Sequence, residues 1–335
     1  MDVEDKMDLI KRNCTEEIIV EDELKNLLET NNHPKHYIGF EVSGRLHLGS
    51  LILSGMKIND FAKAGFETTV FVADWHAWIN NKLGGDWEKI KMATDYFKEG
   101  FNFFCPNTKI IKGSDLYHNN DDYWKNVVKF SKKTTLARTT RCLTIMGRSE
   151  KDKLDTAQYL YPSMQAIDIK TLDVDVAHAG MDQRKIHVLA REVFPKLGWK
   201  KPIAVHHHIL SGLKKSSEKM SKSKPDTAIF IHDSKEEIEK KINNAWCPEK
   251  IVSGNPVAEI MKYIIIPTKN EITIERPEKF GGDLTVGEDF SKLYESGKIH
   301  PLDLKKNVAR YLNEIIDPIR KHFENEKFKE ILRMI

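Results

Sequence analysis

The feature that most constrains the fold is a strand–helix–strand unit within residues 36–74. The segment "HYIGFEV" (36–42) is rich in β-branched and aromatic residues and ends at Ser43-Gly44, as a strand running into a turn does. A helix is predicted next, because apolar residues recur at helical spacing up to Gly65: Leu48, Leu51, Ile52 and Met56. "FETTVFVAD" (66–74) predicts the second strand. Two strands joined by a helix lie parallel, so this unit predicts an α/β fold with a Rossmann-like parallel sheet.

The remaining chain predicts two domains. Further strands are expected at 108–113, 173–180 and 202–210, with helices between them that include a basic stretch after residue 113. From about residue 233 the strand pattern fades and apolar spacing becomes helical. We therefore predict an α/β domain over 1–232 and a mostly helical domain over 233–335.

Composition limits the class of protein. The chain has 335 residues, of which 40% are hydrophobic and 31% charged, as in soluble globular proteins. The acidic, mixed N-terminus is unlike a secretion signal, and no apolar run approaches the length of a membrane span. Four cysteines lie far apart without a CxxC pair, which supports neither a zinc site nor a disulfide framework. A cytoplasmic protein with no membrane partner and no structural metal is expected.

A basic stretch indicates a phosphate-bearing partner. The formal net charge is only +3, yet residues 125–153 hold nine basic residues against Glu150 and Asp152. Such a bias suits a nucleic-acid backbone, although a solvated helix face is the alternative.

Two short segments carry the candidate chemistry. "EKMSKSKPD" (218–226) packs three lysines and two serines into nine residues, which by itself also suits a solvated loop. "GFEVSGRLHLGS" (39–50) forms the first strand-to-helix turn, and His47 and Gly49 lie where the helix begins. Exposed N–H groups at such a helix start attract phosphate, so the HxG spacing suggests an adenylate-forming site.

Together the two segments resemble a known family. "HLGS" (47–50) is similar to the HIGH signature, and "KMSKS" (219–223) is the literal second signature, of class I aminoacyl-tRNA synthetases. The resemblance extends over nearly the whole chain and is closest to the archaeal and eukaryotic tyrosyl type. It departs at Ser50, where HIGH has histidine. The family implies ATP with Mg²⁺ on its phosphates, tyrosine and tRNA(Tyr) as partners, and a homodimer. It also implies that 1–232 is a Rossmann-like catalytic domain, with a dimer and acceptor-stem insertion at about 110–155, and that 233–335 binds the anticodon.

The resemblance also implies residue roles in activation. His47, Gly49, Lys219 and Lys222 would be catalytic, with the lysines holding the departing pyrophosphate. The implied ATP-binding set is His47, Gly49, Ser50, Gly180, Asp182, Lys219, Met220, Ser221, Lys222 and Ser223.

The segment 159–187 carries the choice of amino acid. Tyr161, Gln165 and Asp168 are spaced to share one helix face. By resemblance, Tyr161, Gln165 and Gln183 would hold the ammonium group of tyrosine, and Asp168 with Tyr37 would hold its hydroxyl. Glu41 and His76 would lie near the same pocket. The alternatives are that the tyrosines are ordinary core aromatics and that Asp168 is an exposed helix residue.

RNA contacts are implied in both domains. The acceptor stem would meet Arg138, Arg141, Arg184 and Lys185. Phe280 and His300 would stack an unpaired anticodon base, and Asp303 would accept hydrogen bonds from it. Phe280 as a core residue and Asp303 as a helix-start residue are the alternatives.

Two rival functions and one rival site remain open. The chain could be a tryptophanyl relative with the same fold and chemistry, or a non-catalytic RNA-binding protein on a synthetase scaffold. "HHH" (206–208) could suggest a metal site. Because successive strand residues point to opposite faces, three adjacent histidines converge poorly on one ion, which favours packing.

Overall fold

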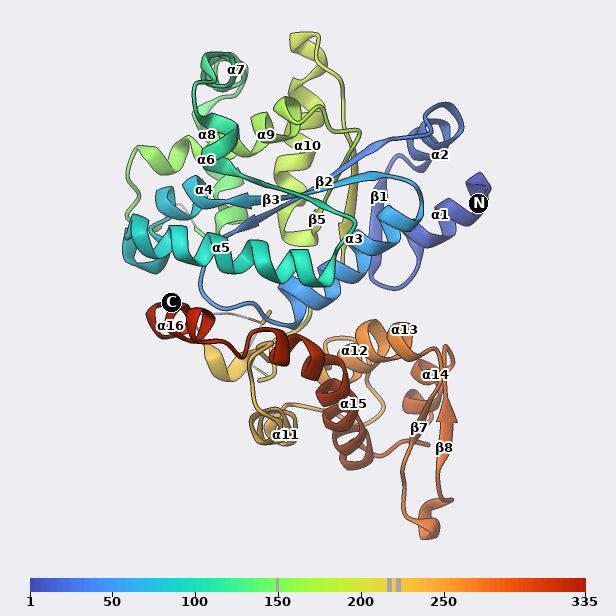
Figure 1. The fold of residues 1–335 in the computed structure, drawn as a ribbon. Helices are drawn as coiled ribbons and strands as arrows, with labels where there is room; N and C mark the ends of the chain where they lie inside the picture. Colours follow the sequence, from blue (N-terminus) through green and yellow to red (C-terminus); the bar gives the residue numbers. More distant parts are fainter. Residues whose placement is uncertain (149–150, 216–218, 221–223) are drawn as a thin grey trace. The chain divides into compact units, whose positions relative to one another are not determined.

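The computed structural model describes residues 1–148, 151–215, 219–220 and 224–335. The chain forms two compact units (Figure 1). The first unit comprises residues 1–44, 55–208 and 334–335, and the second comprises residues 45–54 and 209–333. The short segment 45–54, which follows the strand at residues 35–41 and leads into a helix, thus belongs to the second unit although the residues on both sides of it belong to the first.

The described residues of the first unit form a six-stranded sheet in the order β1-β6-β5-β2-β3-β4. The strands are β1 (Thr15–Ile19), β2 (Lys35–Glu41), β3 (Glu67–Ala73), β4 (Lys109–Lys112), β5 (Val176–Gly180) and β6 (Ile203–His207). All neighbours pair in parallel except β1, which pairs antiparallel with β6. The five predicted strands are confirmed. β1, with the sequence "TEEII", was not predicted, because an acidic, half-exposed edge strand lacks an apolar run.

The connections place helices on both faces of this sheet. α3 (Ser54–Lys63) and α5 (Trp87–Phe104) lead from β2 to β3 and from β3 to β4, while α10 (Arg184–Val193) leads from β5 to β6 in the opposite direction along the sheet. Right-handed crossovers therefore put α10 on the other face. Figure 1 shows α5 in front of the sheet and α10 behind it. The Rossmann-like arrangement is confirmed.

The first unit contains further helices, including those of the basic stretch. They are α1 (Val3–Lys11), α2 (Glu21–Thr30), α4 (Asp74–Ile79), α6 (Gly113–Tyr117), α7 (Asp121–Ser131), α8 (Leu136–Cys142) and α9 (Tyr161–Thr171). α7 and α8 confirm the mostly helical character predicted after residue 113. Gly65, at φ +91°, follows the end of α3 as predicted, in a left-handed conformation that glycine adopts without strain.

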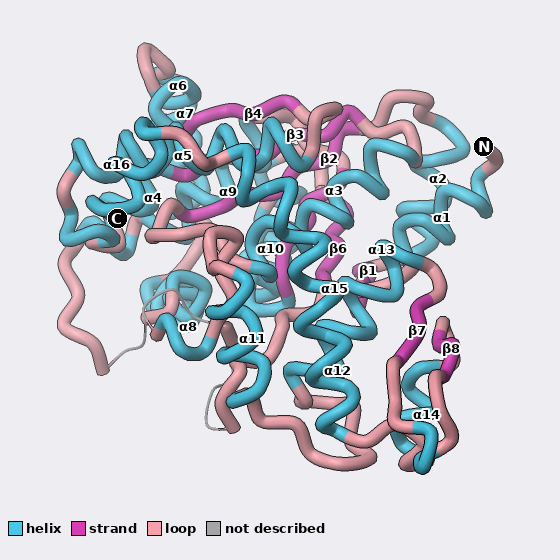
Figure 2. Tube along the Cα trace, turned by 60° about the horizontal axis from the view of Figure 1, so that its bottom comes forward, coloured by secondary structure: helices cyan, strands magenta, loops and turns pink. Residues whose placement is uncertain are grey.

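The second unit is mostly helical, as predicted. Its helices are α11 (Lys235–Asn244), α12 (Pro256–Ile260), α13 (Ile266–Lys269), α14 (Phe290–Glu295), α15 (Pro301–His322) and α16 (Glu326–Met334). A small hairpin of β7 (Ile272–Ile274) and β8 (Leu284–Val286) was not predicted; Figure 2 shows its two strands beside α14. Across the described ranges of both units, no helix is long and apolar enough to cross a bilayer.

Candidate active site

The HLGS segment opens the helix after β2 and belongs to the second unit. His47 caps this helix, because its Nδ1 accepts hydrogen bonds from the N–H groups of Gly49 at 3.1 Å and Ser50 at 3.4 Å. The Ser50 hydroxyl accepts in return from the His47 N–H at 3.0 Å. Since Nδ1 acts as an acceptor, the ring proton lies on Nε2, the tautomer that donates to a phosphate oxygen. Ser50, the departure from HIGH, thus completes a capping box.

Gly49 gives the cap its space. A Cβ at Gly49 would lie 3.2 Å from Cε1 and 3.4 Å from Nδ1 of His47, so a side chain would push the imidazole away. The first turn, Leu48–Leu53, is π-helical rather than α-helical as the periodicity predicted. Such turns are frequent at functional sites.

The two signature segments are linked through their backbones. The Leu48 N–H donates to the Ile229 carbonyl at 3.0 Å, and the Ile231 N–H donates to the Leu46 carbonyl at 3.2 Å. Residues 229–231 follow the KMSKS loop, in which Lys219 is exposed and Met220 is buried. Ser221, Lys222 and Ser223 lie outside the described residues. HLGS therefore lies beside the chain that leaves the KMSKS loop.

Asp168, on α9, lies among buried rings in the first unit. Its Oδ1 accepts hydrogen bonds from the hydroxyls of Tyr117 and Tyr123, each at 2.9 Å. Its Oδ2 faces His76 Nε2 at 3.5 Å, and neither of these two atoms has a hydrogen-bond partner in the part of the chain described. Tyr37 is buried and lies close by. Burial raises the pKa of Tyr37, and the nearby charge of Asp168 raises it further. The predicted hydroxyl pair is brought together, with Tyr117 and Tyr123 added.

Burial dominates the electrostatics of this pocket. It raises the pKa of Asp168 to about 8, while the hydrogen bonds from Tyr117 and Tyr123 act in the opposite direction. Burial also lowers the pKa of His76 to about 3, so His76 is neutral and its contact with Asp168 is not an ion pair. Asp168 is 1% exposed, so its interpretation as an exposed helix residue is wrong.

Of the three residues predicted around the ammonium group, Gln165 and Gln183 contact each other. Gln165 Nε2 donates to Gln183 Oε1 at 3.1 Å, and Gln183 Nε2 donates to the Ile145 carbonyl at 2.8 Å. Gln165 Oε1 is buried and has no partner among the residues described. Tyr161 is buried, and the charge of Glu41 is the next cause after burial that raises its pKa.

Asn80 and Lys82 hold Glu41, and sequence reasoning missed both. Asn80 Nδ2 donates to Glu41 Oε1 at 2.8 Å, and Lys82 Nζ lies 3.2 Å from Glu41 Oε2. Arg148 Nε donates in turn to Asn80 Oδ1 at 3.0 Å. These residues lie 39 to 107 positions from Glu41 in the sequence, so no local pattern marks them.

Gly180 and Asp182 lie at the carboxyl end of β5, where parallel sheets bind ligands. Gly180 ends the strand and Asp182, in the next turn, is exposed. The charge of Asp182 raises the pKa of His207, against the larger lowering that burial causes.

The histidine run enters two separate networks on opposite sides of the sheet. His207 Nδ1 contacts His178 Nε2 at 2.8 Å, and His36 Nε2 contacts His178 Nδ1 at 3.1 Å. His206 instead contacts His187 at 3.0 Å. This is the alternation that strand geometry predicts, and the described residues contain no group of three His, Cys, Asp or Glu side chains able to hold a metal ion.

The four basic residues predicted for the acceptor stem line one groove of about 720 Å³ in the first unit. Its lining residues are Arg138, Thr140, Arg141, Cys142, Thr144, Lys151, Arg184, Lys185 and Val188, with no carboxylate. Two of the guanidinium groups are nevertheless paired, Arg138 with Glu192 and Arg184 with Glu17. The groove is thus a concentrated basic surface.

In the second unit, Phe280 is 63% exposed, so its interpretation as a core residue is wrong. His300 is exposed and caps α15, on whose first turn Asp303 lies half-buried. Arg276 links the Phe280 loop to the segment before His300, since it donates to the carbonyls of Gly282 at 2.8 Å and Lys298 at 2.5 Å.

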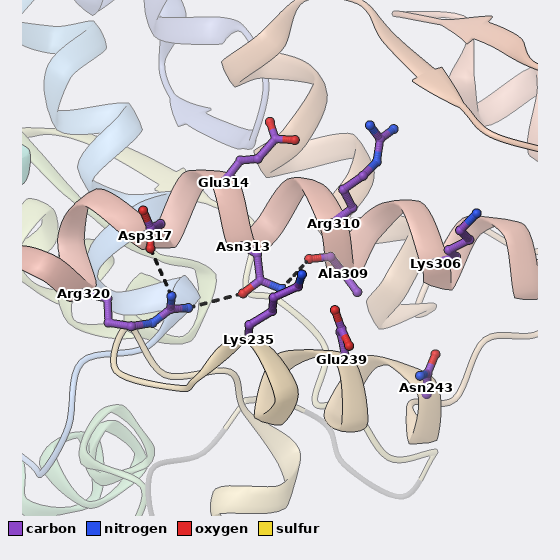
Figure 3. Close-up of a pocket in the computed structure, with 10 residues that line it drawn as sticks. All are labelled: Lys235, Glu239, Asn243, Lys306, Ala309, Arg310, Asn313, Glu314, Asp317 and Arg320. Carbon is purple, nitrogen blue, oxygen red and sulfur yellow. Dashed lines mark hydrogen bonds and ion pairs between the residues drawn. The ribbon is translucent and has the colours of Figure 1, made fainter.

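Another groove of about 710 Å³ lies between α11 and α15 (Figure 3). Its lining mixes both signs of charge, and Arg320 contacts Asp317 at 3.4 Å and Asn313 at 3.3 Å. None of the residues predicted from the sequence lines it.

Comparison with known proteins gives one consistent result. The family model for class I tRNA synthetases (W and Y) matches residues 29–317. A tyrosine–tRNA ligase from Thermococcus kodakarensis is 47% identical, over 97% of this chain and 96% of its own length. One from Sulfolobus acidocaldarius is also 47% identical, over 100% and 98%.

Solved structures agree. Tyrosyl-tRNA synthetase from Pyrococcus horikoshii, complexed with L-tyrosine, superposes with a TM-score of 0.92 at 44% identity and covers both chains fully. Tryptophanyl-tRNA synthetase from Aeropyrum pernix reaches a TM-score of 0.70 at 18% identity, over 93% of this chain and 84% of its own, which is a likeness of fold alone.

Proposed function

Because this chain belongs to the class I tRNA synthetases of the tryptophan and tyrosine group, we propose that it is a tyrosine–tRNA ligase. It activates tyrosine with ATP to give tyrosyl-adenylate and pyrophosphate, and then transfers tyrosine to the 3′ end of tRNA(Tyr). Relatives named as tyrosine–tRNA ligases match nearly the whole chain at 44% to 47% identity. The tryptophanyl structure shares only the fold, which disfavours tryptophan as the substrate.

The observation that carries the proposal is a pair of buried acceptors on α9 without partners among the described residues, Asp168 Oδ2 and Gln165 Oε1. A buried polar atom without a hydrogen bond is costly, so each acceptor favours a ligand that donates to it. Tyrosine carries a phenol hydroxyl at one end and an ammonium group at the other. We assign the hydroxyl to Asp168 and Tyr37, and the ammonium group to Gln165, Gln183 and Tyr161, with Glu41 and His76 beside them.

Activation joins a carboxylate oxygen of tyrosine to the α-phosphorus of ATP and breaks the bond to pyrophosphate. Negative charge grows on phosphate oxygens, where preorganised donors and cations act most strongly. His47 donates from Nε2, Gly49 leaves space for the nucleotide, and Lys219 and Lys222 receive the pyrophosphate. The remaining ATP-binding residues are Ser50, Gly180, Asp182, Met220, Ser221 and Ser223. Mg²⁺ enters with the ATP phosphates, as part of the substrate.

Transfer follows when a ribose hydroxyl at the tRNA 3′ end attacks the carbonyl carbon of the adenylate and AMP leaves. The acceptor stem lies on the basic groove of Arg138, Arg141, Arg184 and Lys185, whose charge suits phosphates. Arg138 and Arg184 exchange their carboxylate partners for phosphate. Phe280 and His300 stack an anticodon base that hydrogen-bonds to Asp303.

The proposal extends to assembly and location. Residues 1–232 form the catalytic domain and residues 233–335 the anticodon-binding domain. The insertion at about 110–155 supplies the dimer contact, which is supported by exposed apolar side chains at Val128 (59%) and Leu136 (70%). The homodimer works in the cytoplasm. A Val128→Asp variant should elute as a smaller species than the parent in size-exclusion chromatography.

The decisive test is exchange of labelled pyrophosphate into ATP with each of the twenty amino acids in turn. Exchange with tyrosine alone is the expected result. Exchange with tryptophan would favour the tryptophanyl alternative. No exchange with any amino acid, from folded protein that still binds tRNA, would favour the non-catalytic alternative.

A further inference from the structure

Two tyrosine hydroxyls that donate to Asp168 have no role in the proposed reaction. Tyr117 comes from α6 and Tyr123 from α7, and both donate to the same oxygen, Oδ1. Their rings lie 4.4 Å apart between centroids. Both are buried, with exposed fractions of 4% and 1%. Neither side chain was selected from the sequence.

This arrangement fixes the direction of the carboxylate. A carboxylate oxygen has two lone pairs, and the two phenols occupy those of Oδ1. Asp168 cannot turn about its terminal bond without breaking both hydrogen bonds. Its Oδ2 therefore stays on the side of His76, 3.5 Å from Nε2, without a hydrogen bond in the described structure.

The same hydroxyls are the main groups that favour the charged form of Asp168. Of the surrounding elements, α4 presents neutral His76 and the carboxyl of Asp74, and β2 presents the neutral phenol Tyr37. Burial and the charge of Asp74 both raise the pKa of Asp168, and the two hydroxyls lower it. No lysine or arginine pairs with Asp168 in the ranges described.

The helix that carries Tyr117 is itself held at its start. Asp74 accepts hydrogen bonds from the Ser114 N–H at 3.0 Å and from the Ser114 hydroxyl. A Cβ at Gly113 would lie 2.5 Å from Asp74 Oδ1 and 3.1 Å from Tyr117 Cε2. Glycine at this position thus lets Asp74 and Tyr117 pack against the same backbone.

We infer that Tyr117 and Tyr123 are positioning residues for amino-acid selection, which hold Asp168 so that Oδ2 accepts the substrate's phenol hydroxyl. The inference rests on the proposed function. It adds a second layer to the pocket: the hydroxyls of Tyr117 and Tyr123 select tyrosine over phenylalanine without touching either amino acid.

The test compares Tyr117→Phe, Tyr123→Phe and the double variant in pyrophosphate exchange, with tyrosine and with phenylalanine, from pH 6.5 to 9. Each lost hydroxyl should lower kcat/KM for tyrosine about tenfold and leave exchange with phenylalanine as low as in the parent protein. The loss should reside in KM. Because the charged form of Asp168 loses a donor, the rise of tyrosine activation with pH should also move to higher pH, which a merely structural defect would not cause.

Tyr159→Phe is the matched control, because it removes a phenol hydroxyl from a ring packed against the same core. It should behave as the parent protein. If the double variant fails to fold, the single variants decide. If both single variants keep the parental preference for tyrosine over phenylalanine and the parental pH profile, the inference alone is overturned. A parent protein inactive with tyrosine would overturn the proposed function as well.

Discussion

The chain of three histidines across the sheet should make this protein sensitive to mild acid. His36, His178 and His207 are buried, and each outer ring contacts a different nitrogen of His178. A neutral imidazole has one donor and one acceptor nitrogen, so neutral rings satisfy such a chain. Burial lowers the pKa of His36 to about 3 and of His207 to about 4, and lowers that of His178 well below its usual value.

The sign follows from the proton balance. The unfolded histidines titrate near pH 6.5, so between that pH and about 4 the unfolded state binds more protons and stability falls as the pH falls. At pH 5 each histidine costs about 2 kcal/mol, or about 6 kcal/mol for the three. His76, lowered to about 3, adds about 2 kcal/mol to this loss, whereas Asp168, raised to about 8, offsets about 3 kcal/mol of it.

Urea unfolding followed by circular dichroism between pH 7.5 and 5.0 measures this loss. His178→Gln removes one titrating ring, so its free energy of unfolding should fall by about 2 kcal/mol less than that of the parent. His33→Gln, at an exposed position, is the control and should fall as the parent does. A parent protein that loses less than about 2 kcal/mol, or a His178→Gln variant with the parental slope, would refute the reasoning.

Three further predictions concern function. His47→Ala and Lys219→Ala should each lower tyrosine-dependent pyrophosphate exchange at least about a hundredfold. Their affinity for tRNA, measured by filter binding, should stay nearly intact. Unchanged exchange in both variants would contradict the site assignment. Gly39→Ala should raise KM for tyrosine about tenfold or more without changing that for ATP, because the new Cβ would lie 2.5 Å from Tyr37 Oη; parental kinetics would show that the pocket adjusts. Phe280→Ala should weaken tRNA binding by about 1–3 kcal/mol with exchange unaffected, and equal affinity would argue against stacking there.

Local patterns predicted the sheet well. The strand expected at 66–74 is β3, Glu67–Ala73, and the one expected at 202–210 is β6, Ile203–His207. Buried parallel strands are nearly continuous apolar runs, so the sequence alone marks them. β1 and the β7–β8 hairpin were not predicted, because short or edge strands bury one face at most and so lack a continuous apolar run.

The sequence by itself determined the strand–helix alternation, the two signatures and the residue types of the pocket, because these are encoded within a few consecutive positions. Tertiary structure alone decided that the hydroxyls of Tyr117 and Tyr123 converge on Asp168, from 51 and 45 positions away. It likewise decided that Asn80 and Lys82 hold Glu41. A hydrogen bond depends on separation and direction in space, and when its partners lie far apart in the chain only the packed fold sets either.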